Sequence, residues 1–269
     1  MRVIVISDME GVSGIVNAEQ VLAGRPLYEE GRRLYTEDIN AAVRGARAAG
    51  ATEVIVMDHH GAGGAYNFNS LIPDVLDSGC EYVVQASWTE YTAALEEGCD
   101  ACLLIGMHAM AGTQDGVLAH TVSGTSWTDL RFNGTLVGET GINAALCGTW
   151  DCPVVMVSGD SATCAEATAL LGDRLTTVAV KQGLGRQKAR LVAPTRAREL
   201  IEEGARRALS NFGAVAPYDP GSPCEIEVAF SSTEALDAYR RKPGIEVLHS
   251  RKLVSRGETW WEAWQRLYH

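Results

Sequence analysis

Three short apolar runs stand out in the first half of the chain because no polar residue interrupts them. They are residues 3–6 (VIVI), 54–57 (VIVM) and 102–105 (CLLI). Runs of this length without polar alternation are typical of strands buried on both faces, as in a parallel sheet covered by helices. Similar runs at residues 82–84 and 154–157 predict two further strands.

Helical patterns separate these runs. Between Tyr28 and Ala49 apolar residues recur every three or four positions, and Gly50 follows as a C-terminal cap. Residues 89–97 carry a second, shorter helical pattern. The alternation predicts an α/β fold, a doubly wound and mainly parallel sheet with right-handed crossovers.

The pattern changes at two places. Two strand-like segments flank Asn133-Gly134, the preferred dipeptide of a type I′ hairpin turn, and lead into a helix near Glu139. After residue 194 come an Arg/Glu-rich helix, a Gly/Pro-rich connector, two strand-like runs with a helix between them, and a Trp-rich final helix. We therefore expect two domains: an α/β metal-binding catalytic domain (1–194) and a small α+β domain (195–269) for oligomerisation or pocket formation.

The tryptophans of the last helix have two interpretations. Trp260, Trp261 and Trp264 fall on neighbouring turns, which can mark a ligand-stacking surface. Large aromatic side chains more often pack against a core or a neighbouring subunit. We expect packing or an interface here.

Composition narrows the class of protein. With 269 residues, 46% hydrophobic and 21% charged, the chain is an ordinary globular protein. The formal charge of -11, without a basic block, argues against nucleic-acid binding. No apolar run approaches the roughly 20 residues of a membrane helix.

The cysteines and the N-terminus predict a cytoplasmic protein. The chain enters a strand at once instead of a signal peptide, and the seven cysteines suit buried thiols in a reducing compartment. Cys99 and Cys102 have C-x-x-C spacing, but an isolated pair of this kind is a weak redox or zinc motif.

Acidic and histidine residues follow three of the apolar runs. Asp8 and Glu10 come after the first, His60 after the second and His108 after the third. Parallel strands end at one edge of the sheet, where open α/β folds bind their ligands, so these side chains can converge. Carboxylate with imidazole suits zinc, or less selectively manganese, cobalt or iron. A helix-capping Asp and a hydrogen-bonded structural His are the alternatives at any single position.

The ordered set of motifs resembles the DppA-type family of zinc-dependent D-aminopeptidases. The motifs are SDMEG (7–11), DHHG (58–61), GMHA (106–109), AHT (119–121), VGETG (137–141), SGD (158–160) and VKQ (180–182). The likeness covers the first seven-tenths of the chain and is loose after that.

The resemblance implies a peptidase with two Zn²⁺ ions per subunit. Their ligands would be the five residues Asp8, Glu10, His60, His108 and Glu139, with Asp8 as the bridge. His120 matches the family's active-site histidine, which is not a permanent ligand. The family also implies a ring-shaped homo-oligomer, a decamer in its best-known member.

One departure from the family pattern is the double histidine. A small residue commonly stands where this chain has His59. Side chains alternate along an extended segment, so we expect one of the pair to reach the metal, and the motif alignment favours His60.

The expected activity is hydrolysis of short peptides, with D-residues such as D-Ala at the amino end, through a metal-bridged hydroxide. The leaving amine needs a proton, and His120 is our candidate for the acid/base or for an oxyanion donor. A two-metal phosphoesterase, another amidohydrolase and a non-catalytic oligomeric metal-binding protein remain alternatives.

Overall fold

The computed structural model describes residues 1–85 and 92–268, and its larger sheet is mainly parallel. The strand order is β3-β2-β1-β4-β7-β8-β9, with β9 antiparallel to its neighbour β8 and the other pairs parallel. The strands are β1 (Arg2–Ser7), β2 (Glu53–Asp58), β3 (Glu81–Val83), β4 (Ala101–Met107), β7 (Val154–Asp160), β8 (Thr176–Gly185) and β9 (Lys188–Leu191).

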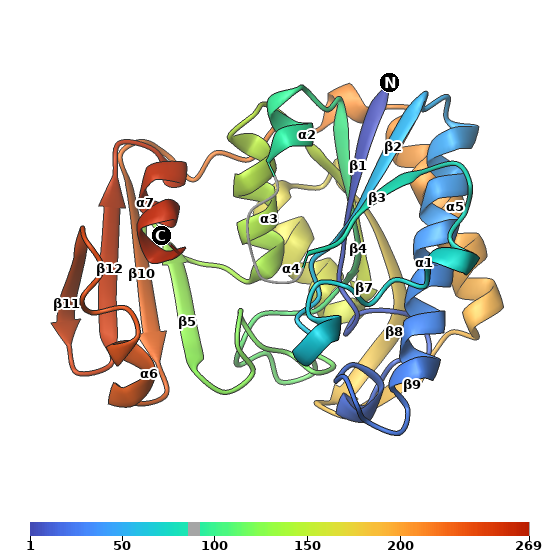
Figure 1. Cartoon of the computed structure of the whole chain (residues 1–269). Coiled ribbons are helices and arrows are strands. Elements are labelled where there is room, and N and C mark those ends of the chain that lie inside the picture. The colour runs from blue at the N-terminus through green and yellow to red at the C-terminus, as the bar shows by residue number, and fades with distance from the viewer. Residues whose placement is uncertain (86–91, 269) are drawn as a thin grey trace.

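A second, antiparallel sheet lies beside the first, at the left in Figure 1. Its order is β11-β12-β10-β5-β6. The strands are β5 (Trp127–Phe132), β6 (Thr135–Leu136), β10 (Cys224–Phe230), β11 (Ile245–His249) and β12 (Lys252–Gly257).

Helices cover both faces of the parallel sheet (Figure 1). Helices α1 (Tyr28–Ala48) and α5 (Pro194–Leu209) pack together on one face. The other face carries α2 (Ala93–Glu96), α3 (Glu139–Gly148) and α4 (Ser161–Leu171). The antiparallel sheet is followed by α7 (Trp260–Tyr268) and carries α6 (Thr233–Asp237); short 3-10 turns lie at Ala18–Gln20, Gly64–Tyr66, Pro73–Val75 and Phe212–Ala214.

The first strand shows why the apolar runs lack polar alternation. Val3 and Val5 pack in the cluster with α1 and α5, while Ile4 and Ile6 pack in the cluster on the opposite face. All four side chains are fully buried. A strand covered on both faces needs an apolar residue at every position, so the predicted α/β fold with a mainly parallel sheet is confirmed.

The core on the α3 face continues into the antiparallel sheet. Phe132 and Val228 belong to the same apolar cluster as Ile4 and Leu146. Trp264 joins this cluster and stacks on Trp260 at 5.3 Å between ring centroids, so the last helix is packed as expected.

The hairpin prediction is confirmed. Asn133 and Gly134 have φ angles of 46° and 82°, the left-handed values that a type I′ turn requires at both central positions. The β9 and β12 strands and the long β8 were not predicted, because polar and glycine residues interrupt their apolar pattern.

The division into domains at residue 195 stays a prediction. Helix α5 packs on α1, and strand β5 pairs with β10, so each side of that boundary contributes an element to the other. The predicted helix at 89–97 is described from residue 92 onward, and α2 occupies its second half. Within residues 1–85 and 92–268, no helix has the length and apolar character needed to cross a membrane.

Candidate active site

Strand ends bring the site residues together at the carboxyl edge of the parallel sheet. Asp8 and Glu10 follow β1, and the neighbouring strands β2 and β4 lead to His60 and His108. Pairing aligns Ser7 with both Asp58 and Ile105, so β1 and β2 end level and β4 runs two residues farther, to Met107. Glu139 reaches the same place as the first residue of α3.

Asp8 and Glu10 lie on a tight turn that follows β1 rather than on an extension of the strand. The Asp8 amide donates to Ile105 O at 2.9 Å, and the Gly11 amide donates to Gly106 O at 2.8 Å. A Cβ atom on Gly11 would lie 1.9 Å from Met107 O, so the β1 and β4 ends can approach this closely only with glycine there.

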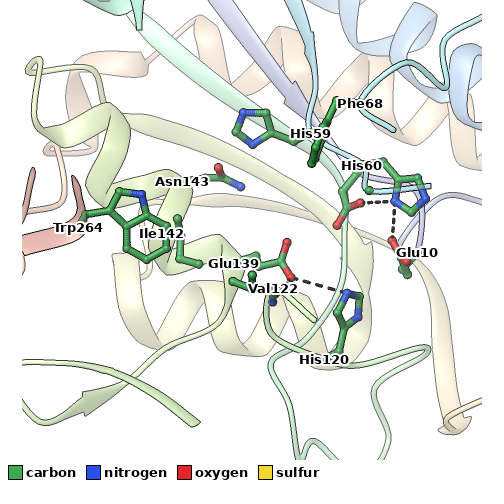
Figure 2. A pocket seen from close by; sticks show the side chains of 12 residues that line it. Glu10, His59, His60, Phe68, His120, Val122, Glu139, Ile142, Asn143 and Trp264 are labelled. Atoms are coloured by element: carbon green, nitrogen blue, oxygen red, sulfur yellow. Dashed lines mark hydrogen bonds and ion pairs between the residues drawn. The ribbon is translucent and has the colours of Figure 1, made fainter. Parts of the chain in front are cut away.

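The two oxygens of Asp8 face two different histidines. Oδ1 lies 3.0 Å from His60 Nδ1, and Oδ2 lies 3.3 Å from His108 Nε2. Glu10 Oε2 is 3.3 Å from His60 Nδ1, and Glu139 Oε1 is 3.2 Å from His108 Nε2. This arrangement is that of a carboxylate that can bridge two cations. Figure 2 shows Glu10 beside His60.

In each of the three histidines beside the carboxylates, one ring nitrogen is hydrogen-bonded to a backbone carbonyl. His60 Nε2 lies 2.7 Å from Val21 O, and His108 Nδ1 lies 3.0 Å from Ala109 O. His120 Nδ1 lies 2.9 Å from Leu118 O. A carbonyl acceptor fixes the tautomer and aims the remaining nitrogen at the carboxylates, which is the usual support of a metal-ligating histidine.

Charge holds the ligand set in its ionised state. Burial opposes the charged imidazolium of His60, but the carboxylates of Glu10 and Asp8 outweigh burial and raise its pKa well above the ordinary value. Burial also opposes the charged form of Glu139 and would raise the pKa of its carboxyl group. The neighbouring His108 and His120 outweigh burial and lower that pKa to about 2. The buried carboxylates therefore require positive charge beside them, and a cation satisfies that need as well as protonated imidazole does.

The donor set fits zinc. Around a tetrahedral zinc with nitrogen and oxygen ligands at about 2.0–2.2 Å, neighbouring ligand atoms lie roughly 3.4 Å apart, close to the 3.0–3.3 Å separations above. In the described part of the chain, His108 Nε2 and Glu10 Oε2 are buried side-chain atoms without a hydrogen-bond partner. Among the described residues, two sets of three side chains each bring their ligand atoms within 4.8 Å of one another. One set is Asp8, Glu10 and His108, and the other is His108, His120 and Glu139.

His120 sits on a strained loop between β4 and β5. Leu118 and Val122 have φ angles of 53° and 60°, a conformation that costs energy for a non-glycine residue and most for a β-branched one. The Val122 amide donates to Glu139 Oε1 at 2.8 Å, and the His120 ring stacks on His108 with 4.0 Å between centroids. His120 Nε2 lies 3.8 Å from Glu139 Oε1, near the carboxylates but farther away than the other two histidines.

A buried lysine holds the turn that carries Glu10. Lys181 on β8 is 2% exposed, and its ammonium donates to the carbonyls of Glu10 (2.6 Å), Val12 (2.8 Å) and Ile15 (2.6 Å). Burial lowers its pKa to about 7, whereas three acceptors favour the ammonium form. Its motif was visible in the sequence, but its role was not, because β8 was not recognised as a strand beside the site.

A cavity of about 200 Å³ opens beside the carboxylates. Figure 2 shows Glu139 at its centre, with His60 and Glu10 on one side and Ile142 and Trp264 on the other. The remaining lining includes Phe68, Asn143 and His59. Trp264 both packs in the core and lines the cavity, so the two interpretations of the tryptophans in the last helix do not exclude each other. The Asn143 contribution could not be predicted, because no local pattern links this residue to the strand ends.

Both histidines of the pair line the cavity, but they have different partners. His60 makes the contacts with Asp8 and Glu10, as the motif alignment favoured. His59 lines the cavity and bonds to Asn143, and burial lowers its pKa to about 4. His59 is therefore held as the neutral imidazole.

Comparison with known proteins agrees with this geometry. A D-aminopeptidase of Bacillus subtilis (strain 168) is 32% identical over 251 residues, which are 92% of this chain and 88% of that protein. The solved structure described as "Zn-dependent D-aminopeptidase DppA from Bacillus subtilis, a self-compartmentalizing protease" matches with a TM-score of 0.91 at 29% identity, covering all of this chain and 96% of the other. The sequence profile of peptidase family M55, described as D-aminopeptidase, matches residues 1–268, and this chain therefore belongs to that family.

Proposed function

We propose that this protein is a metal-dependent aminopeptidase that hydrolyses short peptides with a D-amino acid, such as D-Ala, at the amino end. The observation that carries the proposal is the meeting of three carboxylates and three carbonyl-anchored histidines at one sheet edge. Membership in the D-aminopeptidase family supports the substrate class.

Five residues would hold two zinc ions per subunit. They are Asp8, Glu10, His60, His108 and Glu139. Asp8 would serve both metal positions, because its two oxygens face His60 and His108 separately. When bound, zinc activates water near neutral pH and polarises the substrate carbonyl.

His120 would transfer the proton that the leaving amine needs. Its Nε2 faces Glu139, and its Nδ1 is committed to Leu118 O, so one nitrogen is available on the cavity side. The hydrogen bond to Leu118 O and the stacking on His108 keep the ring in that position. A neutral imidazole there can accept a proton and an imidazolium can return it.

The C-terminal helix would form part of the pocket through Trp264, while the antiparallel sheet supports it. We also infer a homo-oligomer, since the Bacillus relative is described as self-compartmentalizing. The ring-shaped decamer that the family resemblance implies is our proposal for its form. Light scattering of the protein as it elutes from a size-exclusion column tests the number of subunits. Location in the cytoplasm stays a prediction.

The proposed function is tested by amino-acid release from D-Ala-D-Ala and L-Ala-L-Ala, each with added zinc and with a chelator. We expect cleavage of the D peptide that the chelator abolishes. A protein that cleaves neither peptide but hydrolyses a generic phosphate ester would contradict the proposal and favour the phosphoesterase alternative.

A further inference from the structure

Two cavities meet at the candidate metal ligands. The first, here called the Trp264 cavity, is the one lined by His59, Phe68, Ile142, Asn143 and Trp264. The second, here called the Arg186 cavity, measures about 420 Å³ and is lined by Leu22, Leu118, Ser123, Thr125 and Arg186 among others. Both cavities share Glu10, His60, Gly61, His120 and Val122. A bond cleaved at the ligands therefore has room for one substrate residue on each side.

The two cavities differ in charge. Asp8 and Glu139 line the Trp264 cavity but not the Arg186 cavity. Arg186 lines only its own cavity, and among the described lining residues of the two it is the one lysine or arginine. Asp8 and Glu139 are candidate zinc ligands, so Arg186 is the charged group that can distinguish the two ends of a peptide, by attracting the carboxylate at the C-terminal end.

Arg186 is the first residue of the turn between β8 and β9, and hydrogen bonds hold its guanidinium beside the Arg186 cavity. The Arg186 carbonyl accepts a hydrogen bond from the Leu118 amide at 2.8 Å, and Arg186 Nη1 donates to Ala119 O. The backbone of Gly124 lies close enough that a Cβ there would be 3.7 Å from Arg186 Nη2. A guanidinium carries five N–H donors in a planar fork, which suits two-point binding of a carboxylate.

We propose that Arg186 binds the C-terminal carboxylate of the substrate and so orients short peptides across the site. The amino-terminal residue occupies the Trp264 cavity, beside the carboxylates of Asp8 and Glu139. The leaving residue occupies the Arg186 cavity. This inference rests on the proposed aminopeptidase function and adds a substrate class to it: dipeptides and other peptides short enough to bring a free carboxylate to Arg186.

A purely structural role for Arg186 predicts a different outcome. Arg186 donates to the carbonyl of Ala119, the residue before His120. If the role were structural, removal of the guanidinium would displace the loop that carries His120. Such a displacement would slow every substrate to the same extent. A carboxylate-binding role instead affects only substrates that end in a carboxylate.

The test compares D-Ala-D-Ala with its C-terminal amide, D-Ala-D-Ala-NH2, which is cleaved at the same peptide bond. The quantity measured is the ratio of kcat/KM for the acid to kcat/KM for the amide, with zinc present. We expect the wild-type enzyme to favour the acid by about tenfold or more, the usual value of a charge-assisted hydrogen bond. Arg186→Gln should bring the ratio close to one, with the loss mainly in KM.

Arg190→Gln is the matched control, because Arg190 is an exposed arginine on β9 that lines neither cavity. It should keep the wild-type ratio. An equal loss of both activities in Arg186→Gln, or a wild-type ratio near one, would overturn the assignment of Arg186 while leaving the aminopeptidase function intact. Hydrolysis of neither substrate by the wild-type enzyme would instead contradict the proposed function itself.

Discussion

The two sheets contribute to the site in different ways. Three adjacent strands of the parallel sheet end in candidate ligands, so its edge supplies the chemistry. The antiparallel sheet supplies no residue within the ligand set; its core supports α7, which places Trp264 in the cavity wall. The parallel layer thus supplies the reaction chemistry and most of the pocket lining, and the antiparallel layer adds the part of the wall that Trp264 forms.

This difference predicts how substitutions should separate. Changes at the parallel edge should affect metal content or turnover while leaving the apolar core in place. Changes in the antiparallel layer should affect stability and substrate affinity while leaving the ligands in place. Four substitutions test this separation, and they follow in order of expected effect on activity.

Asp8→Ala should have the largest effect, because both oxygens of Asp8 face ligand histidines. We expect bound zinc to fall at both positions and kcat/KM for D-Ala-D-Ala to fall more than about 10³-fold, beyond the 10–100-fold typical of residues that only support a ligand. Metal analysis of the purified variant checks this, with the exposed Asp173→Ala as control. Two zinc ions retained per chain would contradict the bridging role.

His120→Ala should retain zinc and lose turnover. Removal of a proton-transfer group costs about 10²–10⁴-fold in kcat, whereas the five proposed ligands remain. Metal analysis together with kcat on D-Ala-D-Ala separates the two quantities. Unchanged kcat would remove His120 from the reaction, and loss of zinc would make it a ligand.

Lys181→Met should loosen the turn that carries Glu10. The substitution removes the buried ammonium from the carbonyls of Glu10, Val12 and Ile15, of which the Val12 carbonyl keeps a hydrogen bond from the Ile15 amide. Each unsatisfied buried group costs about 1–3 kcal/mol, so the free energy of unfolding should fall by several kcal/mol and activity should fall about 10–100-fold. Urea denaturation and kcat/KM measure the two effects; Lys188→Met, at an exposed lysine on β9, is the control. A variant as stable and active as the wild type would show that the turn holds without Lys181.

Trp264→Ala should have the smallest effect on chemistry and a large one on stability. Trp264 is 1% exposed and stacks on Trp260, so its loss should cost about 3–5 kcal/mol of unfolding free energy. It also opens the cavity wall, so KM should rise while bound zinc stays constant. Loss of zinc from this variant would mean that the two layers are not separable.

The sequence was most informative where local pattern and chemistry coincide. Asp8, Glu10, His60 and His108 were predicted to converge because each follows an uninterrupted apolar run, and the parallel sheet brings their side chains to one edge. The position of Glu139 at a helix start could be predicted because the sequence shows both the preceding hairpin and the helix that follows it. The structure contains both elements.

The residues that were missed depend on contacts between distant segments. Lys181 reaches Glu10 across 171 positions of the chain. Arg186 reaches Ala119 from a hairpin whose second strand carries no clear apolar pattern, and Asn143 lines the cavity from the middle of α3. Such contacts are set by tertiary packing, on which local periodicity carries no information.

We propose that the residues gathered at this edge hold two zinc ions, which the peptidase reaction requires. The most direct test is titration of chelator-treated protein with zinc while D-Ala-D-Ala hydrolysis is followed. We predict negligible activity without zinc and a plateau at two equivalents per chain. Full activity in the zinc-free protein, or activity that never rises as zinc is added, would contradict the account.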